Sequence, residues 1–160
     1  WRDVFSATSR VLSVLPSGLA AAIERLQGEN KALGRTVRDM QEQLAGQVAS
    51  RLVNEGAPAP NGRVVVTRAL EGWDANGLKA VASAAIASPG VCVAVFSATS
   101  PALVVVASAK EAGIDASAAV KALIARFGGK GGGKPELAQA GGLQGDVNEM
   151  VTAARELLGA

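Results

Sequence analysis

The sequence predicts an α/β fold: an N-terminal helical hairpin or coiled coil, followed by a small mixed β-sheet with packed helices. Three observations predict it. Apolar residues recur at helical spacing over residues 1–54, prolines and an Asn-Gly pair interrupt the chain over 55–62, and strand-like and helix-like segments alternate from residue 63 onwards. Such alternation is typical of a sheet covered by helices. We therefore expect a helical region over 1–54, a linker over 55–62 and a globular domain over 63–160.

The helical region is expected to contain two helices separated by Pro16. In the second helix, apolar residues follow alternating steps of four and three, the pattern of a coiled-coil seam. Its members are Leu19, Ile23, Leu26, Asn30, Leu33, Val37, Met40 and Leu44. The first helix could fold back on this seam, or the seam could meet a second copy of the chain. A single hairpin leaves Val37 to Leu52 without a local partner, which favours a homodimer or a contact with another domain.

The globular part is expected to form strands over 63–70, 91–97 and 102–108. Asp74, Asp115 and Asp146 are suitable N-caps for three helices between and after these strands. A strand, a helix and a strand predict a parallel crossover, and the short connection over 98–101 predicts an antiparallel hairpin. Because runs such as Val64–Val66 and Val104–Val106 are apolar throughout, we expect helices on both faces of the sheet.

The composition excludes several classes of function. The 160 residues contain no histidine and one cysteine, so an intrachain disulfide, a Ser-His or Cys-His catalytic pair and a His/Cys metal site are impossible. We expect Cys92, which lies in an apolar run, to be a core residue. We expect no catalytic residue, metal or cofactor. There is no membrane-spanning apolar run or signal peptide, and the chain starts at Trp1, so we expect a fragment of a longer cytoplasmic protein.

The stretch 128–142 carries the strongest functional signal. Seven of its fifteen residues are glycine, and Lys130 and Lys134 are its only positive charges. The net charge of the chain is only +2, but residues 110–134 carry five basic and two acidic side chains. Bare amides beside lysines favour anions. We expect a shaped loop that contacts nucleic acid, although a purely structural turn is the alternative. The expected contact residues are Arg126, Gly129, Lys130, Gly131, Gly132, Gly133 and Lys134.

This stretch is not a nucleotide-binding P-loop. Residues 128–134 fit the start of that motif, but Pro135 stands where the motif needs a serine or threonine for Mg²⁺. Proline also disfavours a helical conformation at Lys134. In addition, the stretch follows a helix pattern rather than a strand.

The run Gly128-Gly-Lys-Gly-Gly-Gly-Lys-Pro-Glu136, followed by Ala138-Gln-Ala-Gly-Gly142, resembles the signature of the DHHA1 domain. That domain ends alanyl-tRNA synthetases (the C-Ala domain) and large free-standing alanyl-tRNA editing proteins. The resemblance implies a DHHA1-like fold, binding of tRNA, with tRNA-Ala expected, dimerisation, and a role in translation. The short, simple hairpin slightly favours the editing protein as parent. The alternative is the substrate-binding accessory domain of a DHH-type phosphoesterase that acts on oligonucleotides.

Overall fold

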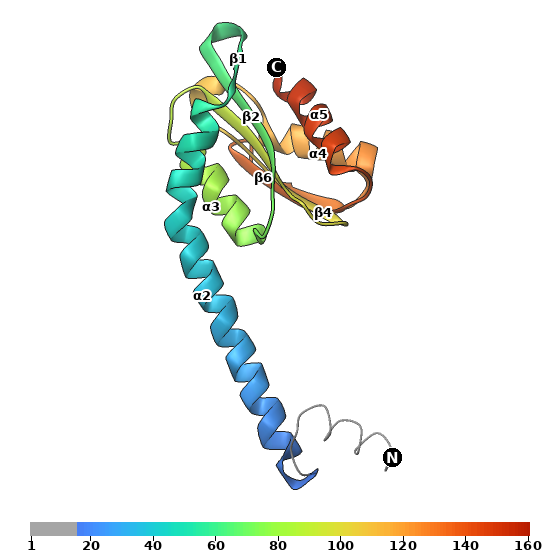
Figure 1. Cartoon of the computed structure of the whole chain (residues 1–160). Coiled ribbons are helices and arrows are strands. Elements are labelled where there is room, and N and C mark those ends of the chain that lie inside the picture. The colour runs from blue at the N-terminus through green and yellow to red at the C-terminus, as the bar shows by residue number, and fades with distance from the viewer. Residues whose placement is uncertain (1–15) are drawn as a thin grey trace. The chain divides into compact units, whose positions relative to one another are not determined.

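Six strands form one mixed sheet in the order β1-β2-β3-β4-β6-β5 (Figure 1). The computed structural model describes residues 16–160. The strands are β1 (Ala57–Ala59), β2 (Arg63–Leu70), β3 (Val91–Ser97), β4 (Ala102–Ser108), β5 (Lys130–Gly133) and β6 (Leu137–Leu143). The α-helices are α2 (Leu19–Asn54), α3 (Ala75–Ala85), α4 (Ala116–Phe127) and α5 (Val147–Leu158). Three short 3-10 turns cover Pro16–Gly18, Pro60–Gly62 and Lys110–Ala112.

The central strands pair as the sequence predicts. β2 and β3 are parallel and joined through α3, and β3 and β4 form an antiparallel hairpin. Asp74, Asp115 and Asp146 cap α3, α4 and α5, because their carboxylates accept backbone N–H bonds of 2.7, 3.0 and 2.7 Å. These parts of the prediction are confirmed.

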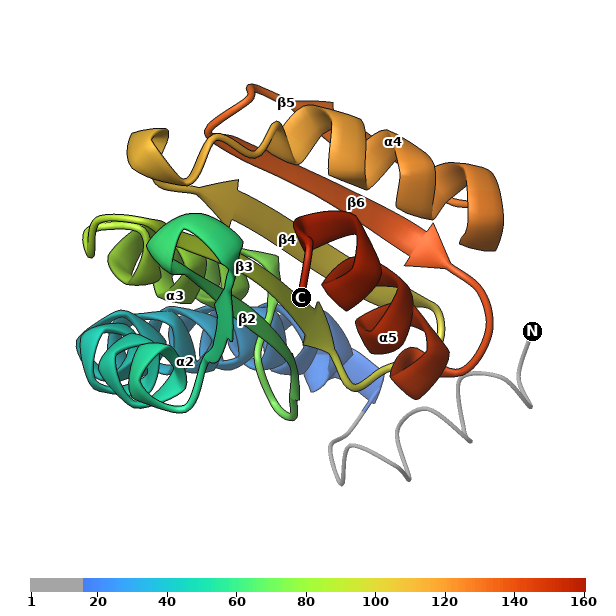
Figure 2. The same ribbon diagram turned by 90° about the horizontal axis from the view of Figure 1, so that it is seen from above.

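Helices cover both faces of the sheet, as Figure 2 shows for α3 on one side and for α4 and α5 on the other. The side chains of β3 are all buried and alternate between two cores. Phe96 belongs to the core beneath α4 and α5, and Val95 belongs to the core beneath α3. The apolar strands are therefore explained by burial on both faces.

The C-terminal part of α2 differs from the prediction. Residues 41–160 form one compact unit. Within it Ala45, Ala49 and Leu52 are at most 3% exposed and share the core of α3. The expectation that the apolar residues from Val37 to Leu52 lack a local partner is therefore wrong for its second half, because small alanines allow the helix to approach closely. The expected first helix, over residues 4–15, lies outside the described residues.

Three strands were not expected. β1 lies within the stretch expected as a linker and pairs antiparallel with β2, with Ala57 opposite Val65. β5 and β6 occupy the stretch expected as a shaped loop, and they extend the sheet beyond β4. The limits 1–54, 55–62 and 63–160 stay a prediction about domain organisation.

Cys92 is fully buried in the core beneath α4 and α5, as expected. Burial raises the pKa of its thiol, although the positive charge of Arg63 and a backbone hydrogen bond oppose the shift. Both burial and a raised pKa suppress the reactive thiolate. We expect a thiol reagent to label Cys92 at least about a hundredfold more slowly in native buffer than in urea. Equal labelling rates would contradict this burial.

In the described part of the chain, no helix combines the length and the apolar character needed to cross a membrane.

Candidate nucleic-acid interface

The glycine-rich stretch forms a β-hairpin whose outer strand, β5, is an edge of the sheet. β5 faces β6 edge-on, so that every second residue of β5 points at the β6 backbone. A Cβ atom at Gly129 would lie 2.5 Å from the carbonyl oxygen of Gly141, and one at Gly133 would lie 2.5 Å from the Cα of Ala138. A Cβ atom at Gly131 would collide with the carbonyl oxygen of Gln139. These three glycines are thus required by the close approach of the two strands.

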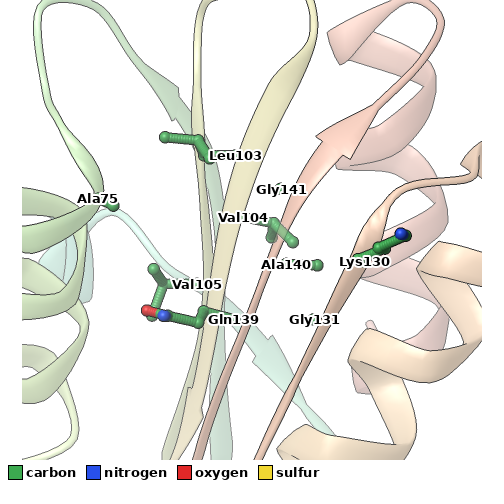
Figure 3. Close-up of a pocket in the computed structure, with 9 residues that line it drawn as sticks. All are labelled: Ala75, Leu103, Val104, Val105, Lys130, Gly131, Gln139, Ala140 and Gly141. Atoms are coloured by element: carbon green, nitrogen blue, oxygen red, sulfur yellow. The ribbon is translucent and has the colours of Figure 1, made fainter.

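The intervening residues of β5 are in a different position. Successive residues of a strand point to opposite sides, so Lys130 and Gly132 of β5 point away from β6, and Lys134 follows directly after the strand. A Cβ atom at Gly132 would meet nothing within 4 Å, and both lysines are exposed. In Figure 3 the side chain of Lys130 extends away from that of Gln139. Together they form the outer row, defined as Lys130, Gly132 and Lys134.

The turn after β5 is held from three sides. The backbones of Lys134 and Leu137 exchange hydrogen bonds of 2.9 and 3.2 Å. The N–H of Ala116, in the first turn of α4, donates to the carbonyl of Pro135 at 2.9 Å, and the N–H of Ser108 donates to the carbonyl of Glu136 at 3.0 Å. These bonds fix the backbone that carries Lys134.

Two hollows lie beside the hairpin on the face of α3. The smaller one, of about 130 Å³, is drawn in Figure 3 and is lined by Ala75, Leu103, Val104, Val105, Lys130, Gly131, Gln139, Ala140 and Gly141. The larger one has a volume of about 450 Å³. We call it the Lys79 groove, and it is lined by Lys79, Gly132, Gly133, Lys134, Glu136, Leu137 and Gln139. Gln139 lines both hollows.

The predicted contact residues are only partly brought together. Gly132, Gly133 and Lys134 line the Lys79 groove, whereas Lys130 and Gly131 line the smaller hollow. Gly129 lies between α4 and β5, directly before β5. Arg126 lines neither hollow. It lies near the C-terminal end of α4, with its guanidinium 5.2 Å from the centre of the Phe127 ring.

Sequence reasoning missed Lys79 and Gln139 as candidate site residues. Lys79 is on α3, about fifty residues before the hairpin, and only the packing of α3 on the sheet brings it there. In the sequence, Gln139 stands out only as part of the DHHA1 signature. A period-2 reading of residues 137–143 as a strand would have placed it on one face with Leu137 and Gly141.

Both lysines of the outer row, and Lys79, lie more than 4.0 Å from every carboxylate among the described residues. Their charges are therefore available to an anion from outside the chain. Across residues 16–160, no three His, Cys, Asp or Glu side chains come together as metal ligands. The site offers positive charge, accessible backbone and one uncharged amide.

The described part of the chain combines a mixed sheet with a glycine-rich edge hairpin that carries exposed lysines. The profile of the DHHA1 domain matches residues 61–160, and the chain belongs to this family. Its fold is shared with the crystal structure of the C-Ala domain of alanyl-tRNA synthetase from Aquifex aeolicus. That match has a TM-score of 0.57 and 21% identity, over 66% of this chain and 98% of the other.

Several curated relatives are alanine–tRNA ligases. The enzyme from Methanosarcina mazei is 30% identical over 94% of this chain and 17% of its own length. The enzyme from Natronomonas pharaonis is 34% identical over 98% of this chain and 17% of its own. The chain therefore spans about a sixth of the length of the curated relatives that it matches. The predicted resemblance to a DHHA1 domain of the C-Ala type is confirmed.

Proposed function

We propose that this chain is the tRNA-binding and self-associating part of a cytoplasmic alanine–tRNA ligase, and that no reaction takes place within it. Relatives that match nearly the whole of this chain are alanine–tRNA ligases. They favour a ligase as parent over a free-standing editing protein. The outer row of β5 carries the proposal of tRNA binding, and tRNA-Ala is the expected partner. An accessory domain of a DHH-type phosphoesterase is the alternative.

The charge of the outer row is suited to an RNA backbone. Lys130 is on β5, whose backbone is fixed by pairing with β6, and Lys134 is in the turn that follows, whose backbone is fixed by the turn contacts. Each lysine that neutralises a phosphate releases counterions, which makes binding depend on salt. With two loop lysines and Arg126, the expected slope of log affinity against log salt is about two to three. Binding by this chain alone is therefore weak and serves to position the RNA.

Gly132 supports the same proposal for a reason that sequence reasoning did not supply. A glycine in a strand is usually required by a close neighbour or by an unusual backbone conformation. At Gly132 no neighbour within 4 Å requires the side chain to be absent, unlike at Gly131. A position without a side chain between two lysines lets a sugar–phosphate chain approach the strand closely. In this proposal, Gly132 is needed to admit the RNA rather than to maintain the fold.

The test is tRNA affinity across a salt series for the 160-residue chain. We expect Lys130→Ala and Lys134→Ala each to lower the slope by about 0.7–0.9, without changing the preference among tRNAs. Lys31→Ala removes an exposed lysine of α2 and serves as the matched control. Circular dichroism checks that each variant is folded. If Lys31→Ala lowers the slope and the two hairpin variants do not, the RNA surface lies on α2.

The proposal of self-association rests on the seam of α2. Six of the seven large apolar side chains that are exposed among the described residues lie on this helix, and Leu33 is 65% exposed. Scattered exposed apolar residues are normal, but a regular stripe of them along one helix is typical of an interaction surface. We assign the homodimer contact to Leu19, Ile23, Leu26, Asn30, Leu33, Val37, Met40 and Leu44.

A further inference from the structure

We propose that the Lys79 groove holds one unpaired nucleobase of the bound RNA, that Gln139 hydrogen-bonds to the edge of this base, and that Lys79 contacts a neighbouring phosphate. This inference rests on the proposed function, because it names a contact made by the same RNA. It adds two residues, from α3 and β6, to a site that otherwise consists of β5 and its turn.

Gln139 is an unusual residue for its place in the sheet. It lies in the middle of β6, opposite Val105 of β4, and points to the face of α3 (Figure 3). Val105 is buried on this face, yet Gln139 is exposed, because α3 does not extend over β6 at this point. None of the hydrogen bonds between described residues uses its side-chain amide. A free donor and a free acceptor are thus presented at the floor of an open groove.

The rest of the groove matches a base joined to a phosphate. Leu137 is half-buried and supplies an apolar surface, while Gly132 and Gly133 leave room beside the strand. Lys79 and Lys134 approach from the α3 and turn sides, and Glu136 is the one acidic residue of the lining. Two lysines and one carboxylate favour a ligand with a negatively charged group at its edge. An unpaired nucleotide has a base with apolar faces and a hydrogen-bonding edge, and it has a negatively charged phosphate.

The amide also defines what the groove can recognise. A glutamine side chain pairs with adenine through two bonds, one donated and one accepted. Uracil also offers a donor beside an acceptor, N3–H beside O4, but it has no exocyclic amino group. Glu136 can accept a further bond from the exocyclic amino group of a base that Gln139 holds in the groove. We expect adenine, which has this group, to be preferred over uracil.

The test separates base contact from phosphate contact by their response to salt. We expect Gln139→Leu, which keeps the size of the side chain, to weaken tRNA binding roughly tenfold at every salt concentration and to leave the slope unchanged. We expect Lys79→Gln to lower the slope by about 0.7–0.9. Gln144→Leu, at an exposed glutamine just beyond β6, is the matched control and keeps wild-type affinity.

A second measurement uses the unaltered chain and single-stranded homo-oligonucleotides of adenine, cytosine or uracil. We expect adenine to be bound several-fold more tightly than uracil, and Gln139→Leu to abolish this difference. Equal binding of all three, or a Gln139→Leu affinity within twofold of wild type, overturns the base contact. If that happens while Lys130→Ala and Lys134→Ala still lower the slope, the proposed RNA surface stands without it. If no variant has an effect, both proposals fail.

Discussion

We expect Gly131→Ala to destabilise the folded chain and to remove the proposed tRNA binding, and we expect Gly132→Ala to leave the stability the same or slightly higher. The two substitutions add the same methyl group to neighbouring residues of β5. At Gly131 the new Cβ would collide with the carbonyl oxygen of Gln139 and lie 2.5 Å from the Cα of Ala140. Backbone atoms of β6 cannot yield without breaking the pairing of the two strands. We expect a loss of about 1–3 kcal/mol, as for other overpacked sites.

At Gly132 the new Cβ meets nothing within 4 Å. Alanine there lowers the conformational entropy of the unfolded chain, which is worth about 0.4–1 kcal/mol in favour of folding. Urea unfolding followed by circular dichroism measures both differences. Similar losses for the two variants would show that β5 does not face β6 edge-on. A larger side chain, in Gly132→Val, should spare the fold and weaken tRNA binding alone.

The sequence predicts the centre of this fold because each local signal there agrees with the packing. Val91–Ser97 is apolar and has no competing helical period, and Asp74 and Asp115 are strong caps before apolar helices. Strand propensity does not predict β5 and β6. Glycine and alanine dominate both strands and are poor strand formers. The Gly-X-Gly-X-Gly run from Gly129 to Gly133 is explained by the close approach of β6, whose backbone leaves no room for a Cβ atom at every second residue of the run.

The sequence predicts an anion site at the glycine-rich stretch, and this stays a prediction; the groove beside it was not predicted. Lysines among glycines indicated an anion site, and Lys130 and Lys134 do lie exposed and unpaired with carboxylates in the described chain. The sequence did not predict that a residue of α3 lines the same groove as the hairpin. Lys79 enters it through α3, whose position depends on the parallel pairing of β2 with β3 rather than on any nearby residue.

The helix α2 illustrates a related difficulty. Its apolar residues continue from the seam to Leu52. The periodicity alone therefore does not show which of them pack on the globular domain and which are left for a second copy of the chain. The buried face begins at Gln41, which is 7% exposed and donates to the carbonyl of Gly72 at 2.8 Å, and it continues with Ala45, which is 3% exposed. Leu44 lies on another face and is 49% exposed, so the exposed stripe and the buried face overlap along this part of the helix.

The exposed stripe leads to the second large effect: the double substitution Leu33→Glu with Met40→Glu should convert a self-associating chain into a monomer. Burying a leucine or methionine side chain is worth about 1.5–3 kcal/mol, and a symmetric dimer loses each contribution in both copies. The expected loss is on the order of 6–12 kcal/mol, which is more than four decades in the dissociation constant. Sedimentation equilibrium at micromolar concentration measures the change in mass.

The control for this experiment adds the same charges to the same helix away from the seam. Ala21→Glu with Ala32→Glu places two carboxylates at exposed positions of α2 and should leave the mass unchanged. Asn30→Leu, within the seam, should strengthen association while loosening the choice of register or partner number, because a polar residue at such a position trades stability for specificity. A wild-type chain that is strictly monomeric, or a loss of association in the control as large as in the seam variant, would show that the stripe on α2 is not the contact between copies.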